Sequence, residues 1–366
     1  MTSSRRRNDP AATSPAPQPT IAPFLLEWYD LHGRDLPWRR TRDPYRIWLS
    51  EVILQQTRVA QGMEYYLRFT ERWPHVDALA AATQDEVLKL WQGLGYYSRA
   101  RNLHAAAKRV AEFFGGEFPK ELAAVRSLPG IGDYTAAAIC SAAYDTPCAV
   151  VDGNVYRVLS RVFDLDVPID TAAGRKAFAR LAQSQLDISQ PGRYNQAIMD
   201  FGALQCTPAQ PRCSDCPLAG RCLALAAGTI AERPAKQGRP KVSDRWFSYL
   251  HITCGDRTLL CRRDGRDIWQ GLYEFPMIET EGPADLRTLA ALPRFRELLG
   301  DEAWHLRRSI EMPRHQLSHR TIHATIHRIS TPALMPAAEP LAVATASLGD
   351  YAVPKLLERY LIKYQI

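Results

Sequence analysis

The sequence predicts a multidomain protein in which an all-α core is followed by a smaller α/β domain. Apolar residues recur with helical spacing through most of the first 225 residues. A basic stretch without apolar periodicity then runs from Ala226 to Arg245, and alternating or β-rich runs follow it. With 366 residues, the chain is long enough for two domains that each bury a core of their own.

The predicted α-helical core covers residues 21–225. A first helix is expected over Ile21–Asp30, and a loop punctuated by prolines over 35–46. Pro44 stands where a helix can begin, because its fixed φ suits the first helical turn. From Tyr45 onward the apolar positions fall at i, i+3, i+4 and i+7. Further helices are predicted over about 76–91, 98–114, 121–127, 134–143, 153–163 and 173–187.

The second predicted domain covers residues 246–366 and is reached through a linker at 226–245. The linker contains five basic and two acidic residues. Strands are predicted over 246–253, 258–262, 272–278 and 322–329, and helices near 284–299 and 352–363. This mixture predicts a small α/β fold.

Composition excludes some classes of protein. Hydrophobic residues make up 46% and charged residues 23% of the chain, as in globular proteins. The formal net charge of +7 permits a polyanionic partner without requiring one. No apolar run approaches 18 residues, so no spanning helix and no membrane partner are expected. Residues 1–20 lack the apolar segment of a secretory signal, and their Pro, Ser and Ala content predicts a disordered tail.

A cluster of cysteines is the most specific pattern in the sequence. Four of the eight cysteines lie within 17 residues, with six, two and five residues between them: Cys206, Cys213, Cys216 and Cys222. Such crowding, in a chain without a predicted export signal, favours metal binding in a reducing cytoplasm. The spacing alone leaves open whether the thiolates hold one zinc ion or an iron–sulfur cluster.

Glu51 is the first candidate catalytic residue. It lies in an apolar helical pattern, LSEVILQQT, where partial burial would raise the pKa of a carboxyl group and suit it to general acid catalysis. The alternative is a surface glutamate paired with Arg58 or Arg46. The polar residues Gln55–Thr57 that follow could enter a base stack or could end the helix with hydrogen bonds.

The stretch Ser127–Asn154 carries the second candidate group. Its LPGIG turn, with Gly130 and Gly132, can direct backbone N–H groups at an anion where the next helix begins at Tyr134. Asp152 and Asn154 follow an apolar run, in a DGN motif that is also typical of a helix N-cap. Two carboxyl groups, Glu51 sheltered in a helix and Asp152 solvated at a cap, could share the work of cleaving a glycosidic bond.

The stretch WQGLGYYSRARNL at 91–103 mixes glycine, two tyrosines and arginine. Aromatic rings interleaved with basic residues suit base stacking together with phosphate contacts. An ordinary turn followed by an amphipathic helix is an equal alternative.

Together these motifs resemble those of the adenine DNA glycosylases of the MutY type, in the helix–hairpin–helix superfamily that includes endonuclease III. The resemblance runs from about Phe24 to the end of the chain and rests on LPW, LSEVILQQT, GLGYYSRARNL, LPGIGDYTAAAI, VDGNVYRV, NQAIMDFG and the cysteine loop. It implies a helix–hairpin–helix core with a six-helix domain at about 36–160. It also implies a cluster domain, 21–35 plus 161–225, whose four cysteines hold a 4Fe-4S cluster.

The resemblance also implies roles for residues of the core. Glu51 matches the acid that protonates N7 of the extruded adenine, and Asp152 matches the carboxylate that stabilises the sugar cation or its covalent adduct. Tyr134 and Asn154 match residues that support these two. Tyr134 stands where lyases of the superfamily have a Schiff-base lysine, so a monofunctional glycosylase is expected.

Other matched residues imply contacts with DNA. Gln56 and Tyr96 match wedges inserted into the stack where the base leaves, and Gly130 and Gly132 belong to the phosphate-binding hairpin. Residues 246–366 resemble the Nudix-like domain that recognises 8-oxoguanine. Within it, the residues that match the loop at the damaged base are Leu317, where that family often has Phe, and Ser318 and His319. The acidic Nudix metal motif is missing after Gly271, so pyrophosphatase activity is not expected.

The implied activity is hydrolysis of the N-glycosidic bond of adenine paired with 8-oxoguanine, and also with guanine, in double-stranded DNA. A monomer is expected, in the cytoplasm and associated with the nucleoid if the protein is bacterial. An endonuclease III-like glycosylase for oxidised pyrimidines is the first alternative, and Tyr134 and the extra domain argue against it. A non-catalytic mismatch-binding or redox-sensing iron–sulfur protein is the second, and the presence of both Glu51 and Asp152 argues against it.

Overall fold

The computed structural model of the chain describes residues 20–238, 242–300, 303–334 and 340–366. Its contacts divide the chain into two units, one of Met1–Arg34 with Pro147–Lys236 and one of Asp35–Thr146 with Gln237–Ile366. The tail predicted at 1–20 lies outside the described residues except for Thr20, and so do residues 239–241 of the linker. None of the described helices is long and apolar enough to cross a membrane.

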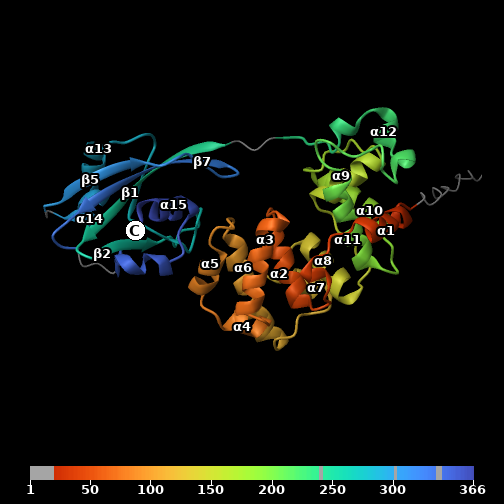
Figure 1. The fold of residues 1–366 in the computed structure, drawn as a ribbon, viewed down its shortest axis with the longest axis horizontal. Coiled ribbons are helices and arrows are strands. Elements are labelled where there is room, and N and C mark those ends of the chain that lie inside the picture. Colours follow the sequence, from red (N-terminus) through yellow and green to blue (C-terminus); the bar gives the residue numbers. More distant parts are fainter. Residues whose placement is uncertain (1–19, 239–241, 301–302, 335–339) are drawn as a thin grey trace, which may run out of the picture. The chain divides into compact units, whose positions relative to one another are not determined.

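The first unit is helical (Figure 1). Its helices are α1 (Ala22–His32), α9 (Gly153–Val162), α10 (Ala172–Gln185), α11 (Pro191–Leu204) and α12 (Leu223–Ala227), with short 3-10 turns at Ala219–Arg221 and Ile230–Glu232. Helix α11 packs against both α1 and α9, and Trp28 meets Phe201 edge to face. The sequence by itself predicts no helix over 191–204. Helix α11 is buried on most of its circumference, so its sequence lacks the polar stripe by which a helix is recognised.

The first part of the second unit contains seven α-helices among the described residues. These are α2 (Pro44–Leu54), α3 (Val59–Arg72), α4 (Val76–Ala81), α5 (Gln84–Trp91), α6 (Ser98–Phe114), α7 (Leu122–Arg126) and α8 (Asp133–Tyr144), after a 3-10 turn at Pro37–Arg39. Helix α2 begins where Pro44 predicts, and Asp43 caps it by accepting from the Tyr45 N–H. The single helix predicted at 76–91 is two helices, because Thr83 and Glu86 form a capping box that begins α5.

Helix α2 lies at the centre of this helical part and packs against α3, α6 and α8. The side chains of Trp48 and Trp91 are fully buried here. Because α2 is surrounded by other helices, polar groups on it are withdrawn from water even though the helix is short.

The second part of this unit is built on a mixed sheet (Figure 1). Its strands are β1 (Ser243–Cys254), β2 (Arg257–Arg262), β3 (Tyr273–Glu274), β4 (Met277–Thr280), β5 (His305–Glu311), β6 (His315–Gln316), β7 (Arg320–Ser330) and β8 (Leu341–Ala344). The order is β3-β2-β1-β7-β5, with β4 on β1, β6 on β7 and β8 on β2. Only the β1–β7 pair is parallel among the described strands.

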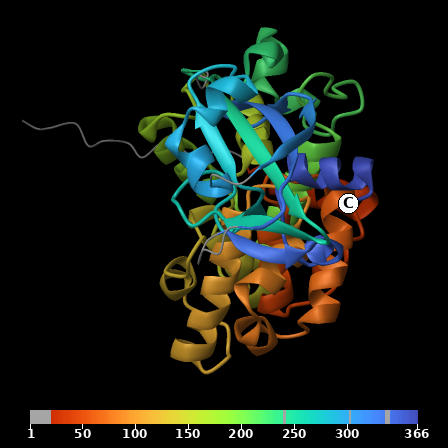
Figure 2. The same ribbon diagram turned by 90° about the vertical axis from the view of Figure 1, so that its left-hand side faces the viewer.

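Helices cover both faces of this sheet, which Figure 2 brings to the front. Helices α13 (Leu286–Ala290) and α14 (Pro293–Leu299) pack on one face in an apolar core with Leu250 and Ile252 of β1. Helix α15 (Lys355–Tyr364) packs on the other through Tyr360, which contacts His251, and a 3-10 turn at Thr345–Asp350 precedes it. The α/β class predicted for this part is confirmed. Strand β5 was not predicted, because most of its residues are exposed and show no alternation.

Candidate functional site

Glu51 lies on the buried side of α2 and is only 9% exposed. The hydroxyl of Tyr134, in the first turn of α8, donates a hydrogen bond to Glu51 Oε2 at 2.9 Å. The pair forms because α2 packs directly against α8. The interpretation of Glu51 as an exposed helix-surface carboxylate is therefore wrong. A buried carboxyl group beside a phenol can hold a proton and direct it at a substrate.

Gln56 and Tyr96 lie on separate loops and share an uncommon backbone conformation. Their φ angles are 55° and 48°, in the left-handed region that residues other than glycine seldom adopt. Both side chains are exposed, Tyr96 by 50%. Backbone of this kind persists only where the surroundings hold it, and it concentrates at functional sites.

Arg99 of α6 holds both of these loops. Its Nη1 donates to the backbone oxygens of Ile53 at 2.8 Å and Gln55 at 2.6 Å. Its Nη2 donates to those of Leu94 at 3.4 Å and Gly95 at 3.2 Å. One guanidinium thus ties the residue before Gln56 to the residue before Tyr96. The arginines of this stretch suggested phosphate contacts, but Arg99 is only 8% exposed and its hydrogen bonds go to backbone oxygens and to the Thr57 hydroxyl. Burial lowers its pKa to about 10.

The LPGIG segment forms a tight turn between α7 and α8, closed by a hydrogen bond from the Ile131 N–H to the Leu128 oxygen. Gly130 has a φ of +76°, and a Cβ there would lie 2.6 Å from Cβ of Asn102. Gly132 is the N-cap of α8, and nothing lies within 4 Å of a Cβ placed on it. The first glycine is thus required by the fold, while the second borders open space at a helix N-terminus, where anions bind favourably.

Asp152 is the N-cap of α9 and accepts a hydrogen bond from the Val155 N–H at 2.8 Å. Asn154 Nδ2 donates to its other oxygen at 2.8 Å. Burial raises the pKa of Asp152, against the opposing effects of these hydrogen bonds and of the Arg157 charge. The expectation of a solvated carboxylate at this cap is corrected, because Asp152 is half-buried. It is oriented by its donors and partly withdrawn from water.

Arg157 connects this carboxylate to the cysteine loop. It donates to Asn154 Oδ1 at 2.8 Å and, through Nε, to the backbone oxygen of Cys206 at 2.7 Å. Gly202 makes room for the arrangement, since a Cβ there would lie 2.6 Å from that of Asn154. Arg157 is not among the residues predicted from the sequence. Its spacing of three residues from Asn154, on the same helix face, was the available signal.

The four cysteines line one cavity of the first unit, together with Arg161 and Arg212. Arg161 Nη1 lies 3.5 Å from Cys206 Sγ. Burial raises the pKa of Cys213, of Cys222 and, to about 11, of Cys216. Among the described residues, no group of three or more His, Cys, Asp or Glu side chains is arranged to hold a metal ion.

Ser318 lies in the tight connection between β6 and β7. Its Oγ is 2.7 Å from the Tyr96 hydroxyl, although 222 residues separate them in sequence. Both line a pocket of about 400 Å³, together with Leu317, His319 and Trp269. The exposed Tyr96 and the Ser318 loop thus meet at one pocket.

The predicted residues are divided between the two units. Glu51, Gln56, Tyr96, Gly130, Gly132, Tyr134, Ser318 and His319 belong to the second, and Asp152, Asn154 and the four cysteines belong to the first. Within the units, the structure brings together Glu51 with Tyr134, Tyr96 with Ser318, and Asp152 with Asn154. Arg99 and Arg157 are the residues that the sequence analysis did not single out.

Two families match separate parts of the chain. Residues 49–182 match the HhH-GPD superfamily base excision DNA repair protein, and residues 248–363 match the NUDIX domain. Among solved structures, a thermostable thymine-DNA glycosylase is similar, with a TM-score of 0.53 and 29% identity over 57% of this chain and 95% of that one. This likeness covers nearly all of that glycosylase and a little over half of this chain.

Curated relatives match over more of the chain. The human adenine DNA glycosylase is 36% identical over 351 residues, which cover 81% of this chain and 64% of the relative. The mouse adenine DNA glycosylase is 44% identical, and 44% of its length is covered. The chain thus spans under two thirds of these mammalian relatives. The adenine DNA glycosylase of Buchnera aphidicola subsp. Baizongia pistaciae is 36% identical, with 69% of this chain and 72% of the relative covered. By this identity and coverage, the chain belongs to the family of the adenine DNA glycosylases.

Proposed function

We propose that the chain is an adenine-specific DNA N-glycosylase of base-excision repair. The observation that carries the proposal is the buried Glu51 carboxyl group, which accepts a hydrogen bond from Tyr134. Membership of the adenine DNA glycosylase family supports the same reaction. Withdrawal from water favours the protonated form of a carboxyl group, and general acid catalysis requires that form.

In the proposed reaction, Glu51 donates its proton to N7 of the extruded adenine. The bond between the sugar carbon C1′ and N9 then breaks, and its electron pair leaves with the base. The sugar becomes an oxocarbenium ion, which Asp152, oriented by Asn154, stabilises with its negative charge. Addition of water at C1′ and loss of a proton complete the hydrolysis.

We infer that the enzyme is monofunctional. A lyase reaction through a Schiff base requires an amine at the sugar carbon. At the start of α8 the chain has Tyr134, whose hydroxyl donates a hydrogen bond to Glu51. A phenol cannot form an imine, so strand cleavage is left to a separate step.

We propose that the mispair contains 8-oxoguanine, or more weakly guanine, opposite the adenine, in double-stranded DNA. The pocket of about 400 Å³ between Tyr96 and the Ser318 loop supports this assignment. Ser318 Oγ can exchange its hydrogen bond with Tyr96 for one to a damaged base, because both hydroxyls can donate and accept. Leu317 contributes an apolar contact beside it.

We propose that the cysteine loop holds a 4Fe-4S cluster. All four thiols line one cavity, which fits a single group bound by all of them. Cysteine thiolates are the ligands that hold such a cluster. The bound cluster would anchor the loop, and the Cys206 backbone would then hold Arg157, and through it Asn154, in place.

One assay tests this function. Duplexes with adenine opposite 8-oxoguanine, adenine opposite guanine, or thymine glycol are incubated with the enzyme and divided into samples with and without alkali. We expect adenine release from the first two, and strand breaks only after alkali. Breaks without alkali would contradict the monofunctional mechanism, and release from thymine glycol alone would contradict adenine specificity.

The double variant S318A/H319A tests the lesion contact. We expect it to lose the preference for 8-oxoguanine over guanine, because a hydroxyl and an imidazole that can meet the damaged base are removed. Base release is measured under single-turnover conditions, with adenine opposite guanine as the internal reference. An unchanged ratio between the two duplexes would refute the assignment.

The two glycines of the hairpin provide a matched pair of variants. Gly130→Ala should lower stability by about 1 kcal/mol or more, because alanine is strained at positive φ and its Cβ would meet Asn102. Gly132→Ala should leave the melting temperature unchanged but weaken binding of undamaged duplex, since its methyl group projects into the space a phosphate would occupy. Thermal unfolding and fluorescence anisotropy measure the two effects. Equal DNA binding by Gly132→Ala and the native chain would exclude a phosphate contact there.

The pH dependence of base release tests Asp152. Burial raises the pKa of Asp152 above its ordinary value of 3.8, so its ionisation disfavours the folded state. Because the reaction needs ionised Asp152, the acid limb of the rate profile should lie above pH 3.8. The Asn154 hydrogen bond lowers this pKa, so Asn154→Ala should raise it further and move the acid limb to higher pH. The profile is measured by single-turnover release between about pH 4 and 9. A limb that stays in place would show that ionised Asp152 does not limit the rate.

A further inference from the structure

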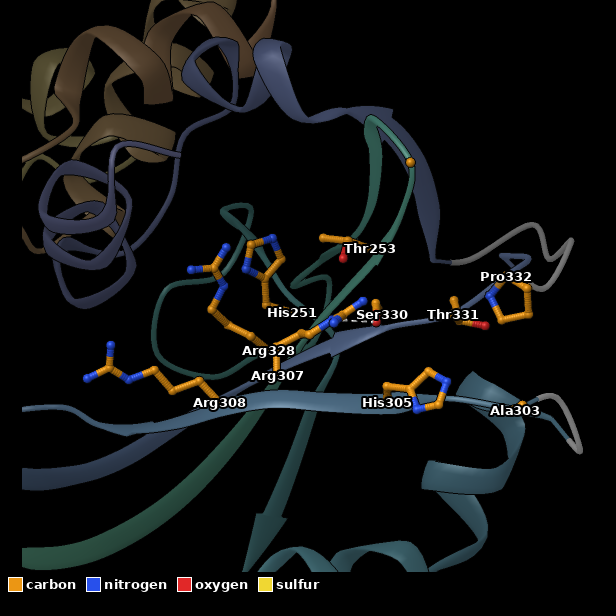
Figure 3. A pocket seen from close by; sticks show the side chains of 11 residues that line it. His251, Thr253, Ala303, His305, Arg307, Arg308, Arg328, Ser330, Thr331 and Pro332 are labelled. Carbon is orange, nitrogen blue, oxygen red and sulfur yellow. Dashed lines mark hydrogen bonds between the residues drawn. The ribbon is translucent and has the colours of Figure 1, made fainter.

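One face of the C-terminal sheet carries a row of basic side chains (Figure 3). His251 of β1 lies beside Arg328 of β7, which in turn lies beside Arg308 of β5. In the next row, Thr253 lies beside Ser330. We call the basic residues of this region the basic face: His251, His305, Arg307, Arg308 and Arg328.

The positive charges of the basic face are not neutralised within the described part of the chain. The basic face lines an open trough, and none of the eleven described residues around this trough is acidic. Arg307 Nε donates to Ser330 Oγ at 2.9 Å, and Arg308 lies 6.0 Å from the ring of Tyr364. By contrast, Arg245 of the same domain pairs with both Asp267 and Glu279. The guanidinium groups of the basic face therefore keep most of their donors for a ligand.

His251 adds a buried donor to this face. It is 1% exposed, and the Tyr360 hydroxyl lies 2.7 Å from its Nδ1. Its Nε2 has no hydrogen-bond partner among the described residues, although it is buried. Burial and the nearby Arg328 lower its pKa to about 4, so the ring is neutral at pH 7. When Tyr360 donates to Nδ1, Nε2 carries a hydrogen that can be donated to an anion.

The chemistry of the trough suits phosphate oxygens. It is open, with a volume of about 990 Å³, and presents guanidinium groups, hydroxyls and an imidazole N–H. Arginine binds phosphate through paired hydrogen bonds. Apart from the two histidines, no described aromatic side chain lines the trough, so it offers little surface on which a base could stack. These features favour a phosphate backbone over a free nucleotide.

The basic face is distinct from the pocket at Tyr96. That pocket includes Arg320 at the start of β7, whereas the trough along the basic face is lined by Arg328 and Ser330 at its end. Strand β7 runs ten residue steps from Arg320 to Ser330, which span roughly 33 Å at about 3.3 Å per residue. That distance equals the length of about ten base pairs at 3.4 Å each.

We propose that the basic face binds the phosphate backbone of duplex DNA away from the mispair, without regard to sequence or damage. Such a contact adds affinity through counterion release and keeps the enzyme on undamaged DNA while it searches. It is independent of 8-oxoguanine recognition, because it lies at the opposite end of β7 from Ser318 and requires no base contact.

The test compares two triple variants of the full-length holoenzyme that remove the same charge. R307Q/R308Q/R328Q alters the basic face, and R287Q/R294Q/R296Q alters exposed arginines of α13 and α14 on the other side of the sheet. Affinity for an undamaged duplex of about 30 base pairs is measured against salt concentration. We expect the first variant to lower the slope of log K against log salt by about 2 to 3, since each lost phosphate contact removes about 0.9. The second variant should change it by less than about 1.

The remaining outcomes are also decisive. An equal change of the salt-dependence slope in both variants would show that only the net charge of the protein matters, and it would overturn the proposal. R307Q/R308Q/R328Q could instead lose binding of inorganic tripolyphosphate while its slope of log K against log salt for the duplex stays unchanged. That result would also overturn the proposal, because it would assign the basic face to a small polyphosphate ligand. R307K/R308K/R328K keeps the three positive charges and should restore most of the salt-dependence slope. Its recovery would show that the glutamine variant loses the slope through lost charge and not through misfolding. Single-turnover adenine release at saturating enzyme should stay within twofold of the native rate in R307Q/R308Q/R328Q, which separates this contact from the proposed catalytic function.

Discussion

Glu51→Gln should bind the mispaired duplex normally and release adenine between about 10² and 10⁴ times more slowly than the native enzyme, as expected when a general acid is removed. Glutamine is nearly the same size as glutamate, and its amide oxygen can still accept the Tyr134 hydrogen bond. Its amide has no acidic proton to transfer to the leaving base. The rate is measured by single-turnover release, and the affinity is measured on a duplex with a non-cleavable adenine analogue.

The matched control is Glu64→Gln, which makes the same chemical change at an exposed position on α3. Its rate and affinity should equal those of the native enzyme. Near-normal base release by Glu51→Gln would remove Glu51 from the acid role. A loss of binding equal to the loss of rate would assign it to substrate binding instead.

Arg99→Met should lower the free energy of unfolding by about 3 kcal/mol, because several buried carbonyl groups lose their donor. In a unit of this size, that change corresponds to a fall of roughly 6–12 °C in Tm. Base release should fall further than the loss of folded protein explains, since the loops of Gln56 and Tyr96 are no longer tied together. Thermal unfolding and single-turnover release below the transition give the two quantities.

Arg68→Met is the control for this variant. Arg99 lies over the ring of Trp91, at 5.0 Å from its centroid. Arg68 lies in the same way over the ring of Tyr65, at 4.7 Å, but donates to only one backbone oxygen, that of Leu90. Its replacement should cost about 1 kcal/mol, as for a single hydrogen bond, and leave base release intact. A fluorescent base next to the target adenine reports unstacking of the duplex, which the resemblance assigns to Gln56 and Tyr96. Normal unstacking by folded Arg99→Met would show that Arg99 has only a structural role.

Local patterns predicted the elements well where the sequence carries a clear signal. Pro44 and the spacing from Tyr45 predicted α2, and the stretch 98–114 coincides with α6. Predictions failed where tertiary contacts replace such a signal. Helix α11 is buried on most sides, and β5 is exposed along most of its length, so neither shows the periodicity of its class. The stretch 76–91 forms two helices and not one, because a capping box begins a new helix within it. The spacing of apolar residues does not reveal such a box.

The candidate site also has features that local sequence patterns predicted and features that only tertiary contacts decided. Residue types and short spacings were enough to single out Glu51, Asp152, the hairpin glycines and the four cysteines, because turns, caps and ligand loops are local in the chain. The burial of Glu51, the desolvation of Asp152 and the meeting of Tyr96 with Ser318 were decided only by the tertiary structure. The position of Arg99 was also decided only by the tertiary structure, because the sequence is equally compatible with a surface and a buried arginine. Burial and hydrogen bonding depend on residues brought together from distant parts of the chain, and packing alone determines which ones meet.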